Sequence, residues 1–274
     1  MSEHYFTPSP AVAAQERSRS FLIRGREHAV MTASGVFSPD RLDRGTRVLL
    51  DHVPDPPGRG TLLDLGCGWG PITLALADAS PRARVLATDV NERALGLTAR
   101  NAAAAGCANV HAIEAAALRA QLERKGTRLD LIWSNPPVRV GKKALHALLA
   151  SWLGLLAPGG EAWFVVGKNL GADSLAAWLQ GTGRAVQIGQ QEEGQDGDEY
   201  QAGAVNEETS DESGRGTCRG DIPHDEQSGS GGEWGVVHEA IHLDPRGRAG
   251  ADRHHRMREQ ARSATNASVR RARG

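Results

Sequence analysis

A glycine-rich segment, Asp64-Leu65-Gly66-Cys67-Gly68-Trp69-Gly70, separates a short apolar run from a stretch with helical character. Glycine at three alternate positions allows a sharp turn and lets the backbone approach a ligand without interference from Cβ atoms. Free N–H groups at the start of the following helix favour an anionic group. The spacing is G-x-G-x-G, which differs from the dinucleotide fingerprint G-x-G-x-x-G. The segment therefore predicts either a tight structural turn or a ligand-binding loop.

Asp89 ends a second apolar run, 21 residues after Gly68. An acid in this place can accept hydrogen bonds from both hydroxyls of a ribose. The alternative is that Asp89 helps to cap the helix that begins beside Asn91. Together with the glycine-rich loop, the acid predicts a nucleoside ligand that carries a carboxylate or phosphate at one end.

The segment Asn135-Pro136-Pro137 follows a further apolar run. Two prolines remove two backbone donors and fix the chain, so we expect unpaired carbonyl groups here. The side-chain oxygen of Asn135 and the carbonyl of Pro136 can accept both hydrogens of an exocyclic amine and so orient the lone pair of its nitrogen. A plain turn is the alternative interpretation.

These segments each follow a strand-like stretch, in a regular alternation of strand-like and helix-like stretches over the first 180 residues. The predicted strands are 61–65, 84–88, 109–113, 129–133 and 161–166, and the predicted helices are 47–53, 71–79, 91–105, 142–156 and 174–180. This order predicts an α/β fold with a doubly wound, mainly parallel, Rossmann-like sheet. Ligands of such sheets bind at the carboxyl ends of the strands, where all three segments fall.

The remainder of the chain has a different composition. Residues 1–184 carry a net charge of +5 and residues 185–274 a net charge of −6. We therefore divide the chain into an N-terminal segment (1–45), a ligand-binding domain (46–184) and a tail of low order (185–274). The tail is either a disordered extension or the product of a shifted reading frame. Its strand-like stretches are 185–188 and 234–243.

Several classes of protein are excluded by composition. No apolar run approaches the roughly 18–20 residues that cross a bilayer, and the N-terminus lacks the pattern of a signal peptide. The three cysteines form no C-x-x-C pair, and the histidines lack ligand spacing, so no metal site and no disulfide framework is expected. We expect a cytoplasmic protein.

The sequence D-L-G-C-G-W-G followed by T-D-V-N resembles the class I S-adenosylmethionine-dependent methyltransferases. The resemblance implies S-adenosylmethionine as cofactor. It places Gly66, Gly68 and Gly70 beside the methionine part, Asp89 at the ribose and Asp64 near the amino group. It also implies cofactor contacts for a second set of residues, namely Phe37, Thr46, Asn91 and Glu114, the last near the adenine.

Asn-Pro-Pro followed by Val138 and Arg139 is similar to the ribosomal RNA guanine-N2 methyltransferases, which include small subunit methyltransferase C. Segments 4–6, 32–38 and 43–46 are similar to the same family. The resemblance implies catalytic roles for Asn135, Pro136 and Pro137. It also implies contacts with RNA, of the small subunit, from Arg139 and Lys142, and no part for a metal or a membrane.

Two other functions stay open at this point. A protein-glutamine methyltransferase shares the Asn-Pro-Pro segment but carries an aromatic residue where this chain has Val138. A non-catalytic remnant that binds cofactor or RNA is the second, because family members end in an antiparallel strand pair that is not evident after Gln180. Four basic residues around Phe21 predict either a strand with a solvated basic face or an RNA contact; they are Arg17, Arg19, Arg24 and Arg26.

Overall fold

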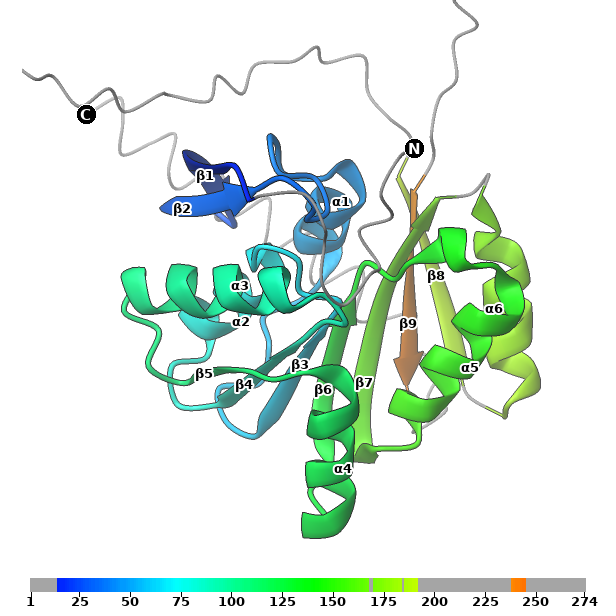
Figure 1. The fold of residues 1–274 in the computed structure, drawn as a ribbon. Helices are drawn as coiled ribbons and strands as arrows, with labels where there is room; N and C mark the ends of the chain where they lie inside the picture. Colours follow the sequence, from blue (N-terminus) through cyan, green and yellow to red (C-terminus); the bar gives the residue numbers. More distant parts are fainter. Residues whose placement is uncertain (1–13, 168–169, 184, 192–237, 245–274) are drawn as a thin grey trace, which may run out of the picture.

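The computed structural model describes residues 14–167, 170–183, 185–191 and 238–244. These residues form a seven-stranded sheet with helices on both faces, and a two-stranded hairpin lies over one end of it (Figure 1). The strand order is β5-β4-β3-β6-β7-β9-β8. Strands β3 to β7 are parallel, which confirms the predicted doubly wound α/β sheet.

The predicted elements are found close to their expected bounds. The parallel strands are β3 (Thr61–Leu65), β4 (Arg84–Thr88), β5 (Val110–Ala112), β6 (Leu129–Ser134) and β7 (Leu156–Gly167). The helices are α1 (Arg44–His52), α2 (Pro71–Ala79), α3 (Glu92–Ala104), α4 (Ala115–Lys125), α5 (Lys142–Leu153) and α6 (Ala172–Gly181), with a 3-10 turn, η1 (Val138–Val140), before α5. Helix α4 was not predicted from the sequence.

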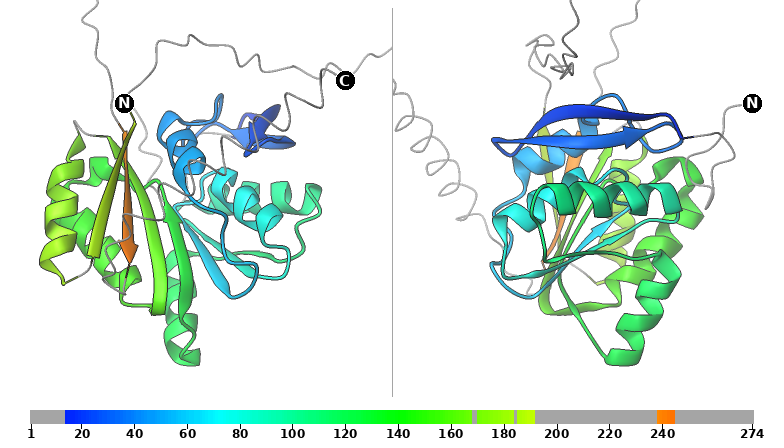
Figure 2. Two further views of the ribbon diagram at one scale, coloured as in Figure 1. Left: turned by 180° about the vertical axis from the view of Figure 1, so that it is seen from behind. Right: turned by 60° about the vertical axis from the view of Figure 1, so that its left-hand side comes forward.

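Two hydrophobic cores lie on opposite faces of the sheet because side chains alternate along each strand. Leu62 on β3 packs into the core that α1, α2 and α3 cover. Its neighbour Leu63 packs into the core that α4, α5 and α6 cover. Figure 2 shows the two helical layers with the sheet between them. The parallel strands are thus buried on both faces, as their continuous apolar runs predict.

The hairpin consists of β1 (Glu16–Ile23) and β2 (Arg26–Ala33), joined by Arg24 and Gly25 with φ of 47° and 81°. Positive φ at both positions is the geometry of a two-residue hairpin turn. The predicted strand around Phe21 is therefore confirmed. Its basic residues have acidic partners within the chain: Arg17 and Arg19 pair with Asp40, Arg24 with Asp55 and Arg26 with Asp78.

The expectation that the sheet lacks its terminal antiparallel pair is wrong. Strand β8 (Ala185–Gln191) and strand β9 (His238–Asp244) are antiparallel to each other, and β9 also pairs antiparallel with β7. Each strand overlaps one of the two strand-like stretches of the tail, 185–188 and 234–243. The sheet therefore extends beyond residue 184, and the domain boundary placed there is corrected. Residues 192–237 and 245–274 lie outside the described part of the chain, and with them most of the predicted tail.

We predict that β9 is required to complete the fold. Ending the chain at Gln191 removes β9 and leaves the backbone donors and acceptors of β7 at an open edge, which favours aggregation. We expect a midpoint of thermal unfolding lower by roughly 5–10 °C and visible self-association. The control ends at Asp244 and keeps every described strand. Sedimentation velocity and calorimetry compare the two, and equal behaviour would contradict the pairing of β7 with β9.

Candidate active site

The loops after β3 and β4 are joined at the carboxyl edge of the sheet. The backbone N–H groups of Gly66 and Cys67 donate to the carbonyl oxygen of Thr88, at 2.9 and 3.0 Å. One carboxylate oxygen of Asp89 accepts from the N–H of Gly68 at 3.0 Å, and the other accepts from the N–H of Asn91 at 2.9 Å. Asp89 therefore holds the glycine-rich loop and the start of α3 together.

The glycines of this loop have two different functions in the structure. Gly66 and Gly68 have φ of 85° and 57° and line a cavity. A Cβ atom on Gly68 would meet no atom within 4 Å, so the space beside it belongs to the cavity. Gly70 has φ of 103°, and a Cβ atom there would lie 3.2 Å from Thr98 of α3. Gly70 therefore permits close packing of α2 against α3 and does not line the cavity.

Asp64 is fully buried below the glycine-rich loop. Its Oδ2 accepts a hydrogen bond of 2.6 Å from the hydroxyl of Thr73, whereas its Oδ1 is buried with no hydrogen-bond partner in the structure. Burial raises the pKa of Asp64 to about 7, and the bond from Thr73 opposes this rise. A buried carboxylate with one unsatisfied oxygen is suited to a cationic donor from a bound ligand.

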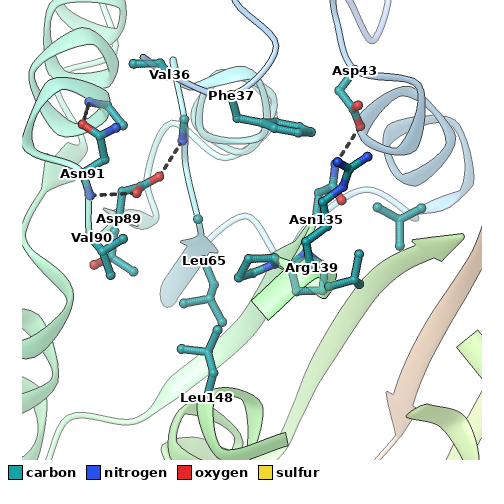
Figure 3. Close-up of a pocket in the computed structure, with 18 of the residues that line it drawn as sticks. Val36, Phe37, Asp43, Leu65, Asp89, Val90, Asn91, Asn135, Arg139 and Leu148 are labelled. Carbon is teal, nitrogen blue, oxygen red and sulfur yellow. Dashed lines mark hydrogen bonds between the residues drawn. The ribbon is translucent and has the colours of Figure 1, made fainter. Parts of the chain in front are cut away.

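The cavity collects most of the predicted site residues in one place (Figure 3). Those that line it are Phe37, Gly66, Gly68, Asp89, Asn91, Asn135, Pro136, Pro137 and Arg139. Burial raises the pKa of Asp89, and hydrogen bonds from the backbone of Asn91, Gly68 and Val90 oppose the rise. The cavity therefore joins the predicted cofactor loops and the Asn-Pro-Pro segment into one site.

The side chain of Asn135 is held by two groups from the N-terminal part of the chain. Its Nδ2 donates to Oδ2 of Asp43 at 2.7 Å and to the hydroxyl of Thr46 at 3.1 Å. Figure 3 shows the contact between Asn135 and Asp43 at the N-terminus of α1. Thr46, predicted to bind cofactor, is buried in α1 and instead binds Asn135.

The expectation of unpaired carbonyl groups in the two prolines is wrong. The carbonyl of Pro136 accepts from the N–H of Val138 at 2.8 Å, and that of Pro137 accepts from Val140 at 3.2 Å. These bonds form because η1 turns the chain back immediately after the prolines. Each carbonyl keeps a second lone pair.

Three other predicted residues lie at helix N-termini. The Asn91 side chain caps α3 and also donates to the carbonyl of Gly35 at 2.8 Å. The Glu114 carboxylate caps α4 by accepting from the N–H groups of Ala116 and Ala117, and Glu114 does not line the cavity. The carboxylate of Glu114 is thus engaged in the cap, and its neighbour Ala115 lines the cavity. Lys142, the first residue of α5, is exposed and outside the cavity lining.

Sequence reasoning missed several residues that line the cavity, among them Asp43, Val36, Leu148 and Leu170. The apolar ones carry no chemical signal. Asp43 does carry one, because an acid three residues before Thr46 at the start of a helix has the spacing of an N-cap. No group of three or more potential metal ligands occurs among the described residues, and none of the described helices is long and apolar enough to cross a membrane.

Comparison with protein families and curated proteins relates this chain to methyltransferases. The family model described as "Methyltransferase small domain" matches residues 27–194. The protein YbxB of Bacillus subtilis is 36% identical over 194 residues, which are 71% of this chain and 96% of that protein. Ribosomal RNA small subunit methyltransferase C of Hahella chejuensis is 38% identical over 146 residues, which are 52% of this chain and 41% of that protein.

A solved structure is also similar. It is the 16S rRNA N2 G1207 methyltransferase of T. thermophilus in complex with AdoMet and guanosine, with a TM-score of 0.53 and 26% sequence identity. The similarity covers 65% of this chain and 48% of that one. The chain therefore spans under half the length of the named ribosomal RNA methyltransferases described above.

We predict that Asp64 makes the folded state less stable as pH rises through the weakly acidic range. The folded state binds the Asp64 proton with a pKa of about 7, against 3.8 for the free side chain, so unfolding releases a proton between these values. The free energy of unfolding therefore falls from about pH 4 to about pH 7.

The variant Asp64→Asn cannot lose this proton, so its stability should not show that part of the fall. Denaturant titrations from pH 4 to 8 measure the difference between the two proteins. Asp173→Asn, at an exposed carboxylate in the first turn of α6, serves as the control. Stability curves for the native chain and Asp64→Asn that stay parallel over the whole range would refute the assignment.

Proposed function

We propose that this chain, which belongs to the methyltransferase small domain family, transfers a methyl group to the exocyclic N2 amine of a guanine in ribosomal RNA. The observation that carries the proposal is the position of the Asn135 amide at the cavity. Its Nδ2 donates to Asp43 and Thr46 at the start of α1, so its oxygen is available to accept a hydrogen bond from a substrate. The names of the ribosomal RNA methyltransferases that it resembles support the choice of guanine and of RNA.

The chain is an S-adenosylmethionine-dependent methyltransferase. When bound, S-adenosylmethionine supplies an electrophilic methyl group on a positively charged sulfur. The residues present fit this cofactor, since Gly66 and Gly68 leave space along the cavity wall and Asp64 has an unsatisfied buried oxygen for an amino group. We assign the ribose hydroxyls to Asp89, whose oxygens keep lone pairs beyond those used by the backbone.

The acceptor amine is oriented by the Asn-Pro-Pro segment. Oδ1 of Asn135 accepts one N–H of the amine, and the second lone pair of the Pro136 carbonyl accepts the other. The nitrogen lone pair then points away from both acceptors and toward the methyl group. Asn135 and Pro136 thus act by positioning, which can lower a barrier by several kcal/mol. The proton that the amine loses afterwards passes to solvent.

We assign contacts with the RNA backbone to Arg139 and Lys142. Arg139 is exposed and lines the cavity beside the Asn-Pro-Pro segment, and Lys142 is exposed one turn later. Lys143 follows at the same exposed end of α5. Cations at this rim suit phosphate oxygens, because protein contacts with a nucleic acid backbone rely on Arg and Lys. The target base must leave its stack to reach Asn135.

We predict that Asp89→Ala weakens cofactor binding by tenfold or more. Hydrogen bonds to a charged acceptor contribute roughly 1.5–3 kcal/mol each, and the variant also loses the link between the glycine-rich loop and α3. Titration calorimetry with S-adenosylhomocysteine measures the affinity. Asp130→Ala, at an acid on β6 that accepts from the backbone of Thr61, controls for a general loss of order. An unchanged affinity in Asp89→Ala would contradict the assignment of Asp89 to the ribose hydroxyls.

The function itself is tested by mapping modified nucleosides in ribosomal RNA from a strain that lacks the gene. We expect one guanine to lose its N2-methyl group, and the native gene to restore it. The gene with Asn135→Ala should not restore it, although the variant protein should bind S-adenosylhomocysteine normally, because Asn135 acts on the acceptor.

Three results would contradict the proposal. Transfer of tritiated methyl groups to protein, with none to RNA, would indicate a protein-glutamine methyltransferase. Binding of S-adenosylhomocysteine without any transfer would indicate a non-catalytic remnant. Restoration by Asn135→Ala would show that Asn135 is only a turn residue.

A further inference from the structure

We propose that Asp43 is a positioning residue, which fixes the amide of Asn135 so that its oxygen, and not its nitrogen, faces the acceptor. The identity of the acceptor rests on the proposed function, whereas the orientation of the amide does not. Asp43 lies in the segment before the parallel sheet, at the N-terminus of α1. The inference therefore gives that segment a part in orienting the acceptor, through Asn135.

The orientation of Asn135 follows from what its partners can do. An asparagine amide fits its site in two ways that differ by exchange of oxygen and NH2. An ionised carboxylate only accepts hydrogen bonds, so the group that faces Asp43 at 2.7 Å must be the NH2. The second hydrogen of the same NH2 is accepted by the hydroxyl of Thr46 at 3.1 Å. The opposite orientation would set the amide oxygen against the carboxylate oxygen.

Asp43 is itself held in place. Its Oδ2 accepts from the backbone N–H of Thr46 at 3.0 Å, as the N-cap of α1, and the helix dipole favours its negative charge. The same oxygen thus binds the start of α1 and the Asn135 amide, which is 92 residues away in the sequence. A rigid helix terminus therefore sets the direction in which Oδ1 of Asn135 points.

Two substitutions at Asp43 separate this function from capping. Serine is as good an N-cap as aspartate, but its hydroxyl is one bond shorter and falls short of Asn135. In Asp43→Ser, α1 should keep its cap while the Asn135 amide loses its anchor. In Asp43→Asn, the amide oxygen has the reach of the carboxylate oxygen and should retain both hydrogen bonds.

The first measurement needs no substrate. In protein labelled with 15N at asparagine, the NH2 signals of Asn135 are those that disappear in Asn135→Ala. We expect these signals to be protected from hydrogen exchange in the native chain and in Asp43→Asn. In Asp43→Ser they should shift and exchange rapidly. Unaltered signals in Asp43→Ser would overturn the proposal.

The second measurement is kinetic. We expect Asp43→Ser to lower kcat by a factor on the order of ten to a hundred, with the affinity for S-adenosylhomocysteine and the thermal midpoint nearly unchanged. Asp43→Asn should retain most of the native kcat. A native kcat in Asp43→Ser, or an equal loss in both variants, would overturn the proposal. If the native chain methylates no ribosomal RNA guanine, the proposed function fails, and the NMR result still decides the orientation of Asn135.

Discussion

The constraint on which the site depends is the parallel register of β3 with its two neighbours. Leu65 at the end of β3 pairs with Thr88 at the end of β4, and Asp64 pairs with Trp133 near the end of β6. The loops that follow β3, β4 and β6 therefore begin side by side at the carboxyl edge of the sheet. They are also joined there, since Gly66 donates to Thr88 and the hydroxyl of Ser134 donates to Leu65 at 2.6 Å. Residues far apart in the sequence share one cavity for this reason.

The end of β3 also carries a buried carboxylate, Asp64, that lowers the stability of the free protein. Asp64 lies in a strand that is buried on both faces, and its unsatisfied oxygen costs the free protein roughly 1–3 kcal/mol. An apolar residue at this position would pack without that cost. Groups that weaken the free fold in this way concentrate where a ligand supplies the missing partner. The burial of Asp64 is thus better explained by binding than by stability.

The sequence predicted the central elements because their signals are local. Residues 61–65, 71–79 and 84–88 match β3, α2 and β4 to the residue, since glycine and proline mark the ends of buried apolar runs. Helix α4 was missed because its alanine-rich, weakly amphipathic stretch carries no clear period. The place of β9 between β7 and β8 was missed for another reason. Its partners lie tens of residues away, and no local pattern specifies such pairing.

The missed part of the site has the same origin. Asn135 was found from its neighbours in sequence, whereas its partner Asp43 comes from a helix that precedes the whole sheet. The loops after β3 and β4 form the proposed cofactor side of the cavity. Asn135 after β6, held by Asp43 at the start of α1, forms the proposed acceptor side. The proposed cofactor and acceptor groups thus come from different loops, which meet at the carboxyl edge of the sheet. A change at Asp43 can therefore alter the orientation of the acceptor without altering cofactor binding.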